Sequence, residues 1–415
     1  MKAPAPTSRS TTPRRAKGLR YWVWSISLVI LATGANQLFE VAPQLQGLRV
    51  WAYKQEMRWT RLGPAYPRKT FVIEIADNDF WNQEFEAREP LRADRLAEIV
   101  DRLVQAHTHV IVLDVDLVSP LGEEGGDLSV YASEDNMLAK SIAVACRNGS
   151  VIVIGKPGFQ KPEDIFKALP SRIDLPSDKY PCVRWGTMYL PADVRLVPMS
   201  TAVEGGGPRL PSLALEALRA TDPTAADWAS RYKDHDFTFG QFIAEEDFGP
   251  RKDQVFRRGW SLLKQMSNKE LDSEVAGRIV LIGAHWNSQA KGQGDLADLH
   301  DTPVGKMTGV FLHANYIEAL SDPHRSFSPV TWQVQMIIDF ALWLVMAVVG
   351  FFELSVIQRL SATVINFLVI FLVGMALLSI SGVFTDMVIG LLVQLIFVII
   401  DEWVAKRKKT VDTVH

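Results

Sequence analysis

The sequence contains none of the short motifs that mark common enzyme classes. It has no Walker A loop, no HExxH metal motif, no GxSxG nucleophile motif and no GxGxxG dinucleotide-binding motif. The run Gly205, Gly206 and Gly207 is not followed by a Lys-Ser or Lys-Thr pair, and such runs are usually linkers. We therefore expect a protein that is not an enzyme, with no catalytic residue and no cofactor.

A strong excess of charge is also missing. The formal net charge is -3 over 415 residues, and no stripe of basic residues interleaved with aromatics occurs in the middle of the chain. Nucleic-acid-binding proteins usually carry a clustered excess of Lys and Arg. We therefore expect no nucleic-acid partner.

The chain does carry four long apolar runs, and proline is absent from all of them. A helix needs roughly 20 consecutive apolar residues to cross the hydrocarbon core of a bilayer. The sequence therefore predicts an all-α region of four transmembrane helices, with the lipid bilayer as a partner. A cleaved signal peptide is the alternative for the first run. The four predicted spans cover residues 21–38, 332–352, 362–380 and 383–400.

The distribution of Lys and Arg predicts the orientation of these spans. Both tails, 1–20 and 401–415, are rich in basic residues, and the loop that contains Arg359 is basic too. Because basic loops stay inside, both termini are expected in the cytoplasm and residues 40–329 outside it. This pattern indicates a multi-pass protein of a bacterial inner (cytoplasmic) membrane, whose main domain is periplasmic or extracellular.

The sequence has only two cysteines, Cys146 and Cys182, and both lie in the expected extracytoplasmic segment. Disulfides persist in such a compartment, so the two residues could be bridged. The alternative is a pair of buried free thiols, because Cys146 lies on the apolar side of a predicted helix.

The extracytoplasmic segment alternates between predicted strands and helices. Short β-branched runs alternate with apolar residues at helical spacing, which predicts an α/β domain with a mainly parallel sheet and helices on both faces. Residues 159–268 have no clear pattern apart from a helix at 213–218, and we assign them to an inserted lobe. Strands are predicted at 70–76, 109–115, 150–155 and 277–283, and helices at 92–106, 133–149 and 308–320.

Polar residues follow several of the predicted strands. In open α/β sheets, ligands bind at the carboxyl ends of the strands, so these residues are candidates for ligand or partner binding. Carboxylates there could also bind Mg²⁺ or Ca²⁺. His285 alone cannot define a zinc site, because no second histidine stands at ligand spacing to it, and we predict no metal site. The alternative is that these residues form turns and helix caps. The candidates are Asp77, Asp79, Asp114, Asp116 and His285.

Three polar residues interrupt the predicted membrane spans, namely Asp339, Asn366 and Gln394. A carboxylate deep in a bilayer is costly, so Asp339 should face the helix bundle. Asn366 and Gln394 could donate hydrogen bonds between helices. The alternative for Asp339 is an interfacial position in a span that starts later.

Five separated stretches share one resemblance. They read TFVIEIADNDF from residue 70, the predicted helix at 91–104, HVIVLDVDLVSP from 109, SEDNMLAKSI from 133, and GRIVLIGAHWNSQAKGQGDLADLHDTPVGKMTGVFLHANYIEAL from 277. Together they resemble the second family of CHASE domains, the cyclase- and histidine-kinase-associated sensory extracellular domains. The resemblance covers roughly residues 40–400. It implies a sensor of an extracytoplasmic signal, with one membrane helix before it and three after it.

The chain departs from that family where a cytoplasmic output domain would follow. The tail after the fourth predicted span, 401–415, is too short to fold as a kinase or cyclase. We therefore expect a membrane-anchored sensory or partner-binding subunit that passes its signal to a separate membrane or cytoplasmic protein. A second copy of the same chain, in a homo-oligomer, is a further option for the partner. The alternative function is a structural or scaffolding subunit of a multi-protein envelope complex.

Overall fold

The chain divides into two units, and the larger one comprises residues 57–328. The two units are described separately. The computed structural model describes residues 46–60, 66–82, 84–117, 128–156, 158–160, 165–191, 193–224, 227, 237–250, 254–289, 293–322 and 325–329, together with scattered residues before 35 and after 332.

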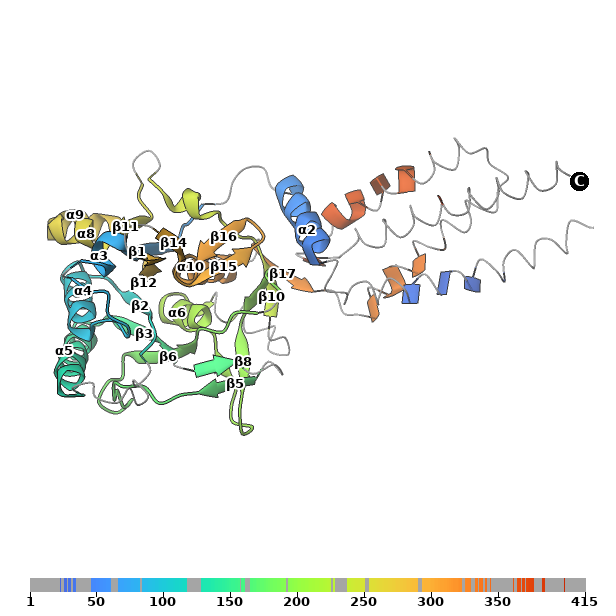
Figure 1. Cartoon of the computed structure of the whole chain (residues 1–415). Coiled ribbons are helices and arrows are strands. Elements are labelled where there is room, and N and C mark those ends of the chain that lie inside the picture. Colours follow the sequence, from blue (N-terminus) through green and yellow to red (C-terminus); the bar gives the residue numbers. More distant parts are fainter. Residues whose placement is uncertain are drawn as a thin grey trace, which may run out of the picture. The chain divides into compact units, whose positions relative to one another are not determined.

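Six parallel strands form the main sheet of the larger unit, in the order β11-β1-β12-β2-β3-β6 (Figure 1). Strands of a parallel sheet that is covered on both faces are apolar along their whole length, as most of these are. The predicted α/β class with a mainly parallel sheet is confirmed. The strands are β1 (Thr70–Ala76), β2 (Val110–Asp114), β3 (Val151–Lys156), β6 (Val183–Thr187), β11 (Arg257–Gly259) and β12 (Ile279–His285).

Successive side chains of each strand point to opposite faces of the sheet, and this produces two separate cores. In β2, Ile111 and Leu113 belong to one core, whereas Val110 and Val112 belong to the other. The first core lies under α3 (Asp77–Phe80), α4 (Ala93–Gln105), α5 (Leu128–Arg147), α8 (Trp260–Gln265) and α9 (Asn268–Val275). The second lies under α6 (Leu213–Thr221) and α10 (Gly309–Ser321), on the opposite face (Figure 1).

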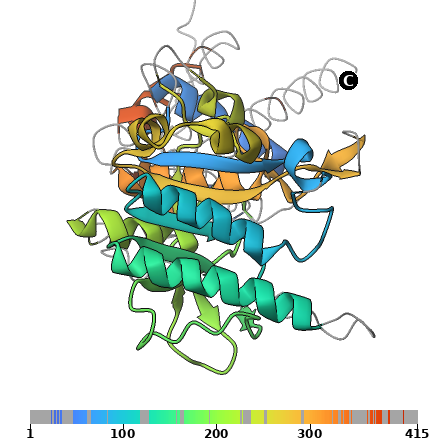
Figure 2. The same ribbon diagram turned by 90° about the vertical axis from the view of Figure 1, so that its left-hand side faces the viewer.

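Helices α4 and α5 run side by side over the first face, as Figure 2 shows. The apolar residues that predicted α4 are all buried in the structure: Leu96, Ile99, Val100, Leu103 and Val104. Helix α5 begins at Leu128, so the predicted start of this helix at Ser133 was wrong. Ser267 does cap α9, where its side chain and that of Glu270 exchange hydrogen bonds with the first-turn backbone.

The stretch 159–268 was predicted to be an inserted lobe. In the structure it is part of the main sheet instead. It supplies β6 and β11, which are the two edge strands of the main sheet, and helix α6 on the second face. The stretch also forms most of a smaller sheet in the order β4-β5-β8-β9. Its strands are β4 (Gly158–Gln160), β5 (Ile165–Ala168), β8 (Ser200–Val203) and β9 (Leu210–Pro211).

Short strands complete the unit. An antiparallel group joins β7 (Leu196–Pro198), β10 (Phe237–Gly240) and β17 (Ser326–Pro329), and a 3-10 helix, η2 (Glu245–Phe248), follows β10. Two hairpins follow the carboxyl end of β12. They consist of β13 (Asn287–Gln289) with β14 (Gln293–Leu296), and β15 (Leu299–Thr302) with β16 (Gly305–Thr308).

Cys146 and Cys182 are joined by a disulfide, with their Cα atoms 5.2 Å apart. Cys146 lies near the end of α5, and Cys182 immediately precedes β6. The bridge therefore ties a covering helix to the edge strand of the main sheet, and both cysteines pack against the first core. Of the two possibilities that the sequence left open, the structure has the bridged one.

Helix α2 (Gln46–Thr60) and the two-residue strand β18 (Val383–Phe384) are the remaining elements. Most residues of the four predicted membrane spans lie outside the described part of the chain. Within that part, no helix is both long enough and apolar enough to cross a membrane. The number and positions of the spans therefore stay predictions. The same holds for the roles of Asp339 and Gln394, which are not described, and of Asn366, which is half-buried.

Candidate functional site

The carboxyl ends of three neighbouring strands meet at one edge of the main sheet. Ala76 of β1 pairs with His285 of β12, and Gly283 of β12 pairs with Asp114 of β2. The structure therefore places the predicted residues Asp77, Asp114 and His285 along the same edge, where α/β sheets bind their ligands. The side chains of these three residues nevertheless contact different partners.

Asp77 holds the main chain at the start of the first hairpin. Its two carboxylate oxygens accept hydrogen bonds from Asn287, one from the backbone N–H and one from the side-chain amide, both at 2.6 Å. The indole of Trp81 donates to the carbonyl of Asn287 at 3.2 Å. Asp77 thus fastens the chain after β12 to helix α3, as expected of a turn-forming residue.

Asp79 also binds backbone. It is 1% exposed, and it accepts hydrogen bonds from the N–H of Ala76 at 3.2 Å and of Ser261 at 3.0 Å, and from the hydroxyl of Ser261. These contacts close the first turn of α3 and attach α8 to it. Asp79 therefore acts as a helix-capping residue, which was the alternative prediction for these aspartates.

Asp114 is buried at the end of β2, whereas Asp116 is exposed. The Asp114 Oδ1 atom lies 3.6 Å from Nε2 of His313 in α10. Asp114 thus differs from Asp77 and Asp79 in its partner, which is a side chain of α10 rather than a neighbouring turn. The aspartates do not share a single ligand-binding crevice.

His285 is the predicted residue with the richest surroundings. Its Nε2 atom lies 3.3 Å from Glu74 Oε2 and 3.5 Å from Glu245 Oε1. Arg257 reaches the same two carboxylates, with 3.8 Å to Glu74 Oε1 and 3.6 Å to Glu245 Oε1. We call these four residues the edge cluster. They come from β1, β11, β12 and η2, so only the folded sheet brings them together.

Burial controls the protonation of the edge cluster. It raises the pKa of Glu74 and of Glu245, and the charge of Arg257 opposes the rise in both. Burial and the nearby Arg257 lower the pKa of His285 to about 4. Each side chain in the cluster nevertheless keeps some exposure, from 13% for Glu74 to 30% for Arg257. The cluster can therefore exchange protons and offer both donors and acceptors to a polar ligand.

The edge cluster also contacts the first turn of α10. His285 Nδ1 lies 3.4 Å from the hydroxyl of Thr308, which precedes the helix, and its ring meets that of Phe311 edge to face at 5.5 Å. The guanidinium of Arg257 lies 5.6 Å from the centre of the same Phe311 ring. A change of charge or ligand in the cluster would thus act directly on α10.

The other end of α10 is fastened to both ends of the larger unit. Glu318, which is 1% exposed, accepts hydrogen bonds through Oε1 from the backbone N–H groups of Arg68, Lys69 and Thr70 at 2.7–2.8 Å. Its Oε2 atom lies 3.3 Å from Nη1 of Arg325, just before β17. The segment that enters β1 and the segment that leaves α10 are therefore held together by one buried carboxylate.

Metal binding gains no support from this geometry. Throughout the described residues, no three or more His, Cys, Asp or Glu side chains are grouped so that they could hold a metal ion. In the edge cluster the positive charge of Arg257 already faces both glutamates. The cluster therefore suits a polar or ionisable ligand better than a cation.

Most of the edge cluster was not predicted from the sequence. Glu74 gave a readable signal, because it is a carboxylate in the middle of the otherwise apolar strand TFVIEIA. Glu318 gave a similar one in the apolar helix α10. Glu245 and Arg257 gave none, because they lie in the stretch without a clear pattern and reach the sheet only through its tertiary structure.

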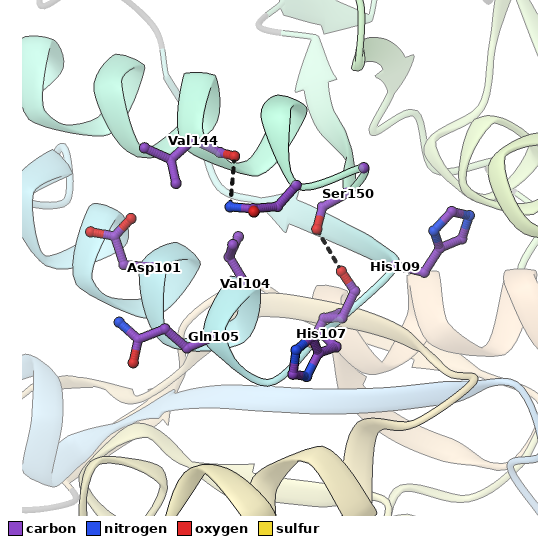
Figure 3. A pocket seen from close by; sticks show the side chains of 10 residues that line it. Asp101, Val104, Gln105, His107, His109, Val144 and Ser150 are labelled. Carbon is purple, nitrogen blue, oxygen red and sulfur yellow. Dashed lines mark hydrogen bonds between the residues drawn. The ribbon is translucent and has the colours of Figure 1, made fainter.

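A hollow lies at the opposite, amino edge of the sheet (Figure 3). It has a volume of about 610 Å³ between the ends of α4 and α5 and the starts of β2 and β3, and Asp101 and His107 are among its lining residues. Ser150 donates to the carbonyl of Thr108 at 2.7 Å, and Asn148 donates to a carbonyl of α5 at 3.1 Å. None of the residues singled out in the sequence lies there.

Comparison with known proteins identifies one family. The family model of the CHASE2 domain matches residues 25–349, which is more than half of the chain and includes the whole of the larger unit. No curated protein and no solved structure matches this chain.

Proposed function

The chain belongs to the CHASE2 domain family, which is a family of extracellular sensory domains, and we propose that it is a membrane-anchored sensory or partner-binding subunit whose signal passes to a separate protein. The larger unit would lie outside the cytoplasm, with both termini inside. The distribution of basic residues supports this orientation. The disulfide suits it as well, because disulfides persist in oxidising compartments.

One observation carries the proposal, namely that α10 connects the edge cluster to the two ends of the larger unit. Thr308 and Phe311, at the start of α10, contact His285 and Arg257. Glu318, near its end, binds the backbone before β1 and faces Arg325. Packed cores do not deform continuously, so a shift at one end of a buried helix is carried to the other.

The orientation can be tested with reporter fusions in the intact protein. A reporter that works only outside the cytoplasm should be active after Ser381, and one that works only in the cytoplasm should be active after Lys409. The opposite result at either site would contradict the four-span arrangement on which the proposal depends.

The transfer of a signal can be tested by cross-linking the tagged full chain in cells and isolating it in mild detergent. We expect one protein with a cytoplasmic effector domain to be recovered. Its recovery should fall when the chain ends after Ala405 or when Arg359 is substituted, and Arg49→Gln is a matched control outside those segments. Recovery of envelope-assembly proteins alone, unchanged in every variant, would favour the scaffolding function instead.

A further inference from the structure

Asp114 and His313 form a buried polar pair in which one atom of each side chain has no hydrogen-bond partner among the described residues. Their side chains are 5% and 3% exposed, and the one close approach between them, from Oδ1 to Nε2, is 3.6 Å. That distance is longer than a hydrogen bond. Among the described residues, neither Oδ2 of Asp114 nor Nδ1 of His313 has a hydrogen-bond partner.

Other buried polar residues of α10 do not share this feature. The Asn315 side chain accepts from the N–H of Ile243 at 2.5 Å and donates to its carbonyl at 3.1 Å. Glu318 accepts three backbone N–H groups. Buried polar groups are normally satisfied in this way. A purely structural role therefore explains Asn315 and Glu318 but does not explain the Asp114–His313 pair.

The burial of the two free atoms limits what could bind them. Each has almost no accessible surface, so neither a solute nor a metal ion can reach it without opening the fold. A proton is not limited in this way, because a brief opening suffices for its transfer. Carboxyl and imidazole groups are also the two side-chain types that exchange protons between acidic and neutral pH.

We propose that the Asp114–His313 pair is a proton-binding site and that acidification is a signal to which this domain responds. The inference rests on the proposed sensory function, and it names the ligand class. The proton comes from solvent and adds to the free lone pair of His313 Nδ1 or Asp114 Oδ2. No covalent bond in the protein breaks.

The groups that face the pair determine its charge. Besides Asp114 itself on β2, they are Tyr316 on α10 and the surface pair Asp298 and His300, whose Oδ1 and Nε2 atoms lie 2.6 Å apart. Burial, with the charge of Asp298, raises the pKa of Asp114 well above its ordinary value. Burial lowers the pKa of His313 to about 4, and His300 opposes protonation as well.

Uptake of a proton would act on the start of α10. Burial disfavours a charge on either group of the pair. A proton on His313 creates an imidazolium whose Nδ1 has no hydrogen-bond acceptor among the described residues, and the negative charge of nearby Asp298 attracts this imidazolium. The carbonyl of Asp298 accepts the N–H of Gly309, the first residue of α10, at 3.0 Å. Acidification would therefore loosen the half of α10 that contacts the edge cluster.

Hydrogen exchange of α10 in the purified full chain in detergent tests this inference. After correction for the intrinsic exchange rate, we expect wild-type α10 to exchange faster as the pH falls from 7 to 5, by up to roughly tenfold per pH unit. His313→Gln should lose most of this rise. His107→Gln, at the exposed amino edge, should keep it. No rise in the wild type, or the same rise in a folded His313→Gln variant, would overturn the proposal.

A second measurement follows the histidine rings directly. Ring nitrogen NMR shifts of the eight histidines, followed as the pH is lowered, should show at least one buried ring that takes up its proton below the ordinary pKa of about 6.5, and Asp114→Asn should shift the titration of that ring. Eight histidines that all titrate near the ordinary value would overturn the proposal. Neither measurement uses a partner protein. A negative result would therefore leave the signalling proposal intact, and loss of partner recovery would leave the proton site intact.

Discussion

The two halves of α10 are equally buried but use their polar residues differently. In the second half, Asn315 and Glu318 are saturated with hydrogen bonds to segments distant in sequence. In the first half, His313 has a free ring nitrogen, and Phe311 contacts the ionisable edge cluster. A buried polar residue can thus either fasten two segments or remain free to titrate. The hydrogen-bond partners show which of the two it does, whereas burial alone does not.

The largest expected effect lies in the second half. Glu318→Ala should lower the free energy of unfolding by about 3–5 kcal/mol, because it leaves the Arg325 guanidinium and three backbone N–H groups buried without their acceptor. Denaturant titration of the purified chain measures this loss. Glu216→Ala in α6, which breaks an ion pair with the partly exposed Arg219, should cost about 1 kcal/mol or less. Equal losses of unfolding free energy in the two variants would show that the buried contacts of Glu318 do not stabilise the fold.

Asn315→Ala should have the next largest effect. The substitution leaves the N–H and the carbonyl of Ile243 without their side-chain partner, at a cost of about 2–3 kcal/mol in the free energy of unfolding. Asn148→Ala is the matched control. Its amide is exposed and bonds only within its own helix end, so its loss should stay within about 0.5 kcal/mol. A small effect at Asn315 would remove the contrast between the two halves.

The first half should respond to pH instead. Because the pKa of His313 is lowered to about 4 by burial, the unfolded chain binds the extra proton at a higher pH, near 6.5. The contribution of His313 to stability is therefore present above pH 6.5 and is lost as the pH falls toward 4, by at most about 1.4 kcal/mol per pH unit. The pKa of His285 is lowered as well, so its contribution to stability is also lost as the pH falls.

Asp114 and Glu74 act with the opposite sign, because their raised pKa values favour the folded state at low pH and this contribution is lost as the pH rises. The informative quantity is thus the difference between wild type and His313→Gln in free energy of unfolding, measured at several pH values. The wild type should lose stability relative to the variant between pH 6.5 and 4. A difference that is constant with pH would mean that His313 does not titrate in this range.

The smallest effect is expected at the surface pair. His300 is 30% exposed, and its contact with Asp298 lies in solvent, so His300→Gln should change the free energy of unfolding by about 0.5 kcal/mol or less at pH 7. Its charge opposes protonation of His313, so the variant should move the pH response of α10 slightly upward. Hydrogen exchange at closely spaced pH values would resolve that shift. A downward shift would show that His300 does not act on the pair.

The sequence by itself determined the α/β class, the core strands and the family. Strands such as 70–76 and 279–285 are buried on both faces, so the apolar run that buries them is also the signal that predicts them. Helix α4 was readable for a similar reason, because one apolar face at helical spacing packs on the sheet. The sequence did not decide whether the two cysteines are bridged, since a disulfide depends on the distance between α5 and β6.

Only the tertiary structure decided which polar residues belong together. Asp77, Asp79 and Asp114 all lie at or just after strand ends in the sequence, yet the first two bind backbone and the third faces His313. Arg257 and Glu245 join the edge cluster from a stretch that carried no periodic signal. Periodicity reports burial against a regular surface, whereas the partner of a polar group depends on where distant segments meet. For that physical reason, the sequence predicted the sheet and its edge but not the cluster on that edge.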